Sequence, residues 1–278
     1  MEGTQNWRGE REAGPPAEVG VSRTRCPSGP ALTAATGDLE RMGAGCNETH
    51  GPEEAARKPT LGRFVIDLIK QNHPKIPIFC FGHSLGSILL LRYASHAYHR
   101  INGIACWNSG IETNLLAIIG RIILSTERKF MDPQKRSIFA WRLTFQSWAN
   151  KIKNKRTEFD WLSHDKAQVD KYIDDKLCGF DVSLQSWLDI ADAVFYSNQN
   201  LSNIPANFPI HLLGGGKDPC TNYGRDMEKL AARLKHSGHS NHILKTIVES
   251  RHETLNELKR DDYAHIFLEW LNSQLNQI

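Results

Sequence analysis

The chain has 278 residues, of which 40% are hydrophobic and 23% are charged, and its formal net charge at pH 7 is +3. These values are typical of a globular protein, and so small a charge without a Lys/Arg-rich run argues against a nucleic-acid partner. The six cysteines show no CxxC spacing, and no signal peptide or bilayer-length apolar run is present, which together predict a cytoplasmic protein.

Residues 1–60 differ in composition from the rest of the chain. They contain no Ile and no Phe, but half of the prolines and nine of the 21 glycines. Apolar residues there follow neither a strand period nor a helix period, so the segment cannot bury enough surface to offset its chain entropy. We therefore expect residues 1–60 to be a disordered or unrelated leader.

The remainder alternates between helices and strands. Apolar spacing predicts a helix over Leu61–Asn72, which ends before Pro74, then a strand over Ile76–Phe81 and a helix over Ser87–Ala97. Further strands are expected at 101–107, 210–213 and 243–248, and further helices at 225–234 and 261–275. This alternation predicts an α/β fold with a mainly parallel sheet covered by helices on both faces.

Residues 111–205 interrupt the alternation. They lack a clear strand and are rich in Trp, Lys and Arg, which favours several helices. We expect a helical cap inserted between a core of residues 61–110 and 206–278, above the strand ends where open parallel sheets bind ligands. The apolar positions Leu115, Leu116, Ile118, Ile119, Ile122 and Ile123 either line an acyl-chain pocket or pack on the core.

The segment Gly82-His83-Ser84-Leu85-Gly86 lies between a predicted strand and a predicted helix. This is the context of a nucleophile elbow, in which a strained turn exposes the serine hydroxyl. We expect both glycines to avoid a collision between the adjoining strand and helix. Ser84 is then the candidate nucleophile, and the backbone N–H of Leu85 the candidate oxyanion donor. The alternative is an ordinary glycine-rich turn.

A serine nucleophile needs a base and an acid, which follow it in the chain in the order acid, then base. Asp218 follows one predicted strand and His252 follows the next, so both fall at the same sheet edge as Ser84. The alternatives are a plain turn residue for Asp218 and a capping or surface histidine for His252. Among the other candidates, we expect structural roles for His83, His211 and His242, solvated positions for His236 and His239, and supporting roles for Glu253 and Glu257.

The source of a second oxyanion donor is not evident from the sequence. Such a donor comes from a loop after an earlier strand. His50-Gly51 is the one His-Gly pair before the elbow, and no predicted strand precedes it.

These motifs resemble the α/β-hydrolase fold, and more narrowly the bacterial lysophospholipase and monoacylglycerol-lipase-like group that is classed with serine aminopeptidases. The similar pieces are the elbow, the cap run Phe159–Ser163, the run Asp174–Phe180 and the histidine segment Arg251–Glu257. The resemblance covers about residues 61–275 and implies that Ser84 is the nucleophile, Asp218 the acid and His252 the base. Members of this group open with several strands that residues 1–60 do not resemble, so the first strands of the fold are expected to be missing.

The expected function is hydrolysis of a carboxylic ester through an acyl-enzyme, with a small acyl ester such as a monoacylglycerol or lysophospholipid as substrate. No metal or organic cofactor is needed for this chemistry. Transient contact with a lipid surface is expected, and the oligomeric state stays open. The alternatives are a catalytically weak or inactive truncated hydrolase and a serine aminopeptidase.

Overall fold

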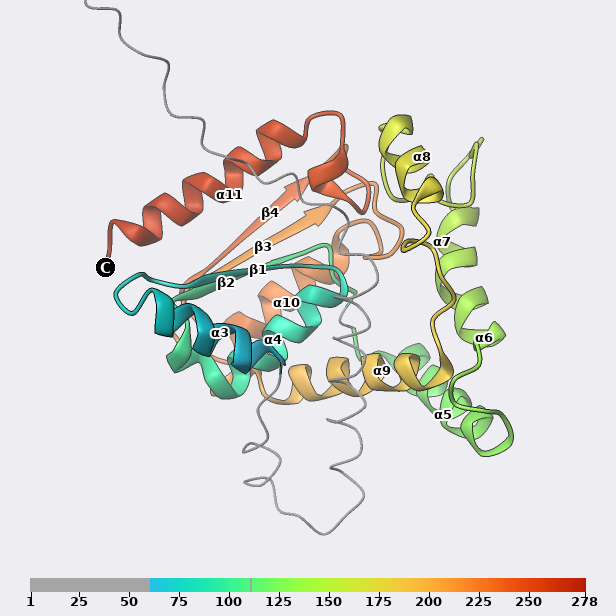
Figure 1. Ribbon diagram of the computed structural model, residues 1–278, viewed down its shortest axis with the longest axis horizontal. Coiled ribbons are helices and arrows are strands. Elements are labelled where there is room, and N and C mark those ends of the chain that lie inside the picture. The colour runs from blue at the N-terminus through green and yellow to red at the C-terminus, as the bar shows by residue number, and fades with distance from the viewer. Residues whose placement is uncertain (1–60, 111) are drawn as a thin grey trace, which may run out of the picture.

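The computed structural model describes residues 61–110 and 112–278 (Figure 1). The expectations about residues 1–60, including disorder and the missing first strands, lie outside these residues. The four strands are β1 (Phe79–His83), β2 (Gly103–Trp107), β3 (Ile210–Gly215) and β4 (His242–Ile247). The helices are α3 (Leu61–Asn72), α4 (Leu85–Ala97), α5 (Leu115–Phe130), α6 (Ile138–Trp141), α7 (Ser147–Asn150), α8 (Lys166–Asp174), α9 (Leu184–Gln199), α10 (Arg225–His236) and α11 (Arg260–Leu275). A π-helical turn at Arg142–Gln146 joins α6 to α7, and short 3₁₀ turns lie at Tyr98–Arg100, Leu201–Asn203 and Thr254–Asn256.

The sheet of the described residues is parallel throughout, with the strand order β1-β2-β3-β4. Because all four strands run the same way, their carboxyl ends meet at one edge of the sheet. The loops that follow the strands at this edge contain Ser84, Asn108, Asp218 and His252. The predicted α/β class is therefore confirmed. Strand β1 begins three residues later than expected, since Pro77 has no N–H to donate and Ile78 donates instead to the Asn102 side chain, at 2.8 Å.

Both faces of the central strands β2 and β3 are buried, which explains why these two strands are mostly apolar, whereas β4 exposes Ile243, Lys245 and Thr246. In β2, Ile104 and Cys106 point into a large core formed with α3, α4, α9 and α10, whereas Ala105 and Trp107 point into a smaller core on the opposite face. Trp270 of α11 closes that second core. Figure 1 shows α11 on one side of the sheet, with α3, α4 and α10 on the other.

The segment between β2 and β3 carries α5 to α9, and we refer to this helical segment as the cap. Its one bridge of strand type joins Arg136 to Ser183 within the described residues. In Figure 1 the arrowheads of β3 and β4 point toward α7 and α8, so the cap lies beyond the carboxyl ends of the strands. Within the described part of the chain, none of the helices combines the length and the apolar character that a membrane crossing requires.

Candidate active site

Ser84 occupies a strained turn between β1 and α4. Its φ and ψ are 53° and −118°. Residues other than glycine rarely adopt this backbone conformation, and residues that do so cluster at functional sites. The turn is held by the Ser84 N–H, which donates to the Trp107 carbonyl at 2.9 Å. The Ser87 hydroxyl also bonds the Gly82 and Trp107 carbonyls, at 2.8 and 3.0 Å. Sequence and structure therefore agree on an elbow.

The two flanking glycines are not equivalent. A Cβ at Gly82 would lie 2.5 Å from the backbone carbon and oxygen of Gly86, so no side chain fits there. A Cβ at Gly86 would meet nothing within 4 Å. The expected steric reason holds for Gly82 and is wrong for Gly86, because the tight approach is made by the Gly86 backbone and not by its missing side chain.

This asymmetry predicts opposite outcomes for two matched variants. Gly82→Ala forces the elbow apart, and we expect loss of both the native fold around β1 and any hydrolytic activity. Gly86→Ala is expected to keep activity and to raise stability by about 0.5–1 kcal/mol, since alanine is favoured over glycine within a helix. Thermal unfolding of both proteins checks this, and equal stability losses would contradict the asymmetry.

The structure brings His252 and Asp218 into direct contact. His252 Nδ1 lies 2.9 Å from Asp218 Oδ2, and both side chains are buried. Asp218 is fixed in turn by the Cys220 N–H at 2.9 Å and the Thr221 hydroxyl at 2.8 Å. Burial opposes charge on His252, but the Asp218 carboxylate outweighs it and raises the histidine pKa well above its ordinary value.

Two aromatic side chains pack against the His252 ring. The Trp161 ring of the cap lies 5.0 Å from it between centroids, and the His83 ring lies 4.8 Å from it. His83 Nε2 also bonds the His252 carbonyl at 2.8 Å, which confirms that His83 packs beside the elbow. The residue before Ser84 is thus in contact with His252, although Ser84 and His252 share no hydrogen bond in the described residues. Apo sites often show such loose catalytic contacts.

Asn108 was missed by the sequence analysis. It follows β2 with a left-handed φ of 48° and is fully buried. Its amide nitrogen donates to the His252 carbonyl at 2.5 Å and to the Thr254 hydroxyl at 2.6 Å, and its oxygen accepts the Gly215 N–H at 2.8 Å. Asn108 therefore connects the segment Arg251–Glu257, which we call the histidine loop, to the ends of β2 and β3. Its place after a predicted strand was the available signal.

The histidine loop is also bonded to the cap. The N–H groups of His252 and Glu253 donate to the carbonyls of Trp161 and Leu162, at 3.4 and 2.7 Å. The buried Glu257 carboxylate accepts the Arg251 N–H at 2.8 Å and contacts His164 Nδ1 at 2.9 Å. This is the supporting role expected of Glu257, and it joins the two motifs Phe159–Ser163 and Arg251–Glu257.

Three of the remaining histidines behave as structural groups or surface groups. His211 is buried in β3, where it accepts the Trp107 indole N–H at 3.0 Å, and burial with nearby Lys245 lowers its pKa to about 4. His236 is exposed, as expected. The expectation of a solvated His239 is wrong: this ring is buried and its Nε2 lies 2.7 Å from the Phe208 carbonyl.

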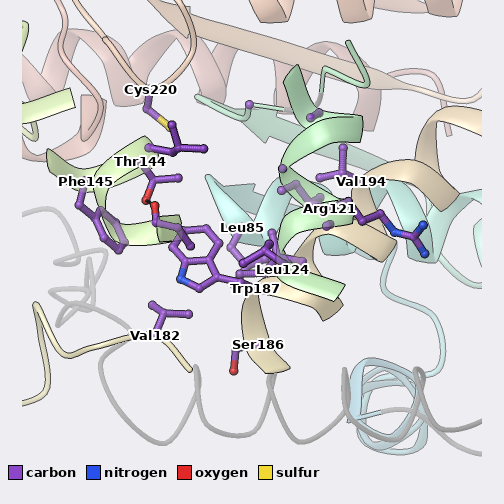
Figure 2. Close-up of a pocket in the computed structure, with 18 of the residues that line it drawn as sticks. Leu85, Arg121, Leu124, Thr144, Phe145, Val182, Ser186, Trp187, Val194 and Cys220 are labelled. Atoms are coloured by element: carbon purple, nitrogen blue, oxygen red, sulfur yellow. Dashed lines mark hydrogen bonds between the residues drawn. The ribbon is translucent and has the colours of Figure 1, made fainter. Parts of the chain in front are cut away.

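A cavity of about 800 Å³ lies between the elbow and the cap (Figure 2). Ser84 and Leu85 form part of its wall together with Cys220 and Trp161. Most of the remaining wall is apolar, with Ile88, Leu116, Leu124, Phe139, Leu143, Phe145, Trp148, Trp187, Ile190, Val194 and Phe195. Of the six apolar cap residues expected either here or on the core, Leu116 lines the cavity and is also exposed. Leu115, Ile118, Ile119 and Ile122 are exposed without lining the cavity, and Ile123 is half-buried.

Leu85 is the first residue of α4. Its N–H therefore has no acceptor within the helix, and the positive end of the helix dipole lies beside Ser84. Among the described residues we assign no second donor.

Comparison with known proteins places this geometry in a family. A family model described as serine aminopeptidase, S33 matches residues 61–259. A search of curated proteins finds no match.

Several solved structures share the fold. A carboxyl esterase from Bacillus coagulans has 22% identity and a TM-score of 0.68, over 78% of this chain and 70% of that one. A soluble variant of the monoglyceride lipase from Saccharomyces cerevisiae has 18% identity and a TM-score of 0.58, over 78% and 70%. The monoacylglycerol lipase from Paleococcus ferrophilus has 20% identity and a TM-score of 0.53, over 82% and 78%. Because the family model covers most of the chain and these structures share its fold, this chain belongs to the serine aminopeptidase S33 family of α/β-hydrolases.

Proposed function

We propose that the chain is a serine hydrolase that cleaves uncharged carboxylic esters of glycerol, with a monoacylglycerol preferred over a lysophospholipid. The observation that carries the proposal is the strained Ser84, which lies on the wall of an apolar cavity beside a buried His252–Asp218 pair. An apolar cavity with a few polar groups at one end suits an acyl chain with an ester at its end.

In this mechanism the Ser84 hydroxyl attacks the acyl carbonyl while His252 takes its proton. Asp218 holds the histidine tautomer through Nδ1 and stabilises the imidazolium that forms. The N–H of Leu85 donates to the oxyanion. His252 then returns the proton to the leaving glycerol oxygen, and water attacks the acyl-enzyme by the same route in reverse. No metal or organic cofactor takes part.

The charges on the cavity wall favour an ester over a peptide. An aminopeptidase needs a free carboxylate for the amino terminus of its substrate. Glu112 lies 2.8 Å from Arg233, and Asp181 lies 2.8 Å from Arg136. Asp226 lies 3.8 Å from Lys229, and burial with nearby Glu112 raises its carboxyl pKa to about 6. Each acidic residue on the wall is therefore neutralised or less acidic than usual.

Helix α5 supports delivery of the substrate from a lipid surface. Its residues Leu115, Leu116, Ile118, Ile119 and Ile122 are all exposed. Leu116 is both exposed and on the cavity wall, so the apolar face is continuous with the cavity. Exposed apolar patches of this kind mark interaction sites, and an amphipathic helix binds the interface of a bilayer.

The test compares kcat/KM for monoacylglycerols of increasing chain length with that for an aminoacyl arylamide. Burial is worth about 0.8 kcal/mol per methylene, so we expect kcat/KM to rise roughly three- to fourfold per added methylene until the cavity is full. The arylamide should be the poorer substrate. Faster cleavage of the arylamide would favour a serine aminopeptidase. The absence of measurable turnover of either substrate would favour a catalytically weak or inactive hydrolase.

A further inference from the structure

Cys220 is placed where the proposed mechanism has no use for it. It follows β3 two residues after Asp218, and it lines the cavity together with Ser84. Figure 2 shows its side chain at the cavity wall, apart from the aromatic residues Phe145 and Trp187. One side-chain donor atom from each of Cys220, Asp218 and His252 lies within 4.8 Å of the other two. A thiol therefore stands directly against the acid–base pair.

These three groups are a matched donor set for one class of cation. Sulfur, imidazole nitrogen and carboxylate oxygen are the protein ligands of Zn²⁺, at bond lengths of about 2.0–2.3 Å in a tetrahedral arrangement. Such bond lengths put ligand atoms about 3.3–3.8 Å apart. His252 Nδ1 and Asp218 Oδ2 are already 2.9 Å apart, and the separations from Cys220, at up to 4.8 Å, exceed this range by about 1.5 Å at most. Rotation of the Cys220 side chain can supply that change.

The surroundings favour the same cation. His252 and Asp218 are almost inaccessible from outside, whereas Cys220 is half-buried and opens to the cavity. A cation entering the cavity therefore meets the thiol first. Mg²⁺ and Ca²⁺ prefer an all-oxygen shell and gain nothing from sulfur or imidazole. The site thus selects a borderline-soft divalent ion.

We propose that Cys220, His252 and Asp218 form a Zn²⁺ site that switches the enzyme off. On binding, the Cys220 S–H bond breaks, a Zn–S bond forms and the proton is released to solvent. Nδ1 of His252 binds the metal, and the proton that it shares with Asp218 moves to Nε2. Nε2 then has no lone pair to accept the Ser84 proton. A fourth position on the ion stays open toward the cavity. Zn²⁺ here is an inhibitor, and the catalytic cycle itself needs no metal.

The inhibition rests on the proposed function, but the metal site does not, and the experiment separates the two. Co²⁺ is added to the full-length chain as a spectroscopic probe, because a thiolate ligand gives Co²⁺ a charge-transfer band in the near ultraviolet. Zn²⁺ is then titrated against the Co²⁺ signal, and ester turnover is measured over the same Zn²⁺ range. Three variants are compared with the parent protein: Cys220→Ala, Cys220→Ser as a second variant that keeps the side-chain size, and Cys178→Ala. Cys178 lies in the cap and is not on the cavity wall.

We expect a Co²⁺–thiolate band that Zn²⁺ removes, and turnover that Zn²⁺ inhibits and a chelator restores. Loss of Cys220 should abolish the band and raise the half-inhibiting Zn²⁺ concentration at least about tenfold, whereas Cys178→Ala should change neither. Mg²⁺ should not inhibit. The difference between parent and Cys220 variants removes any contribution from cysteines in residues 1–60.

Two results overturn the site. One is a band that persists in both Cys220 variants, and the other is a parent protein without any Cys220-dependent band. A third result separates the two proposals: if the parent hydrolyses no ester but shows a Cys220-dependent band, the proposed function fails and the metal site stands.

Discussion

Replacement of Ser84 by alanine is expected to lower ester turnover by about 10⁶-fold in kcat, because the acyl-enzyme can no longer form. The fold should survive, since alanine removes a single oxygen. It also leaves the backbone bond to Trp107 and the Ser87 bonds that hold the turn. The measurement combines turnover with covalent labelling by a fluorophosphonate, followed by peptide mapping. Ser84 should be the labelled residue in the parent protein.

Ser147→Ala is the matched control. Ser147 lies in the cap at the start of α7, and its hydroxyl bonds the Leu143 carbonyl at 2.8 Å. The control removes the same atom without touching the elbow, so labelling and turnover should be unchanged. Full labelling of the Ser84→Ala protein would show that another residue is the nucleophile.

Replacement of Asp218 by asparagine is expected to lower kcat by about 10⁴-fold, because the amide no longer holds the productive histidine tautomer. The same change should move the pH profile. In the parent protein the Asp218 carboxylate raises the His252 pKa, so kcat/KM should rise with pH through a midpoint above the ordinary histidine value. Without that carboxylate, burial acts with less opposition and lowers the pKa. The midpoint should therefore shift to lower pH.

Asp181→Asn controls for removal of a carboxylate from the cavity wall. Asp181 is exposed and pairs with Arg136 at 2.8 Å, so this variant should keep both the rate and the midpoint. A large loss of rate in Asp218→Asn without a shift of midpoint would indicate that Asp218 acts only through the fold. That outcome would remove the acid from the proposed triad.

The sequence was sufficient to predict features that depend on local pattern. Apolar runs located all four strands within a few residues, and the helix Leu61–Asn72 was predicted with its observed bounds. The order of elements then put Ser84, Asp218 and His252 at one edge of the sheet, because strands of one direction end together. The structure adds the contact between His252 and Asp218, which no local pattern encodes.

Features that depend on contacts between distant segments were not predictable. Cys220 was one of six scattered cysteines, and only the packing of the β3 and β4 loops brings its sulfur near His252. The polar character of the loop around His239 suggested that the ring is exposed to solvent, but the ring is buried and hydrogen-bonded to the Phe208 carbonyl. The two glycines of the elbow give a further example. Both match the sequence motif, but only Gly82 lies where a side chain would collide with its neighbours.

The backbone bonds between Trp161–Leu162 and His252–Glu253 restrict how the cap can open. A cap that lifted at this end would pull His252 away from Asp218. The α7–α8 end of the cap is therefore tied to the loop that carries His252, whereas α5 is held to α9 by the Arg121–Asp192 ion pair at 2.7 Å. Because Trp161 both lines the cavity and bonds the His252 N–H, in the proposed mechanism a movement of the cap at this end would disturb the substrate wall and the base together.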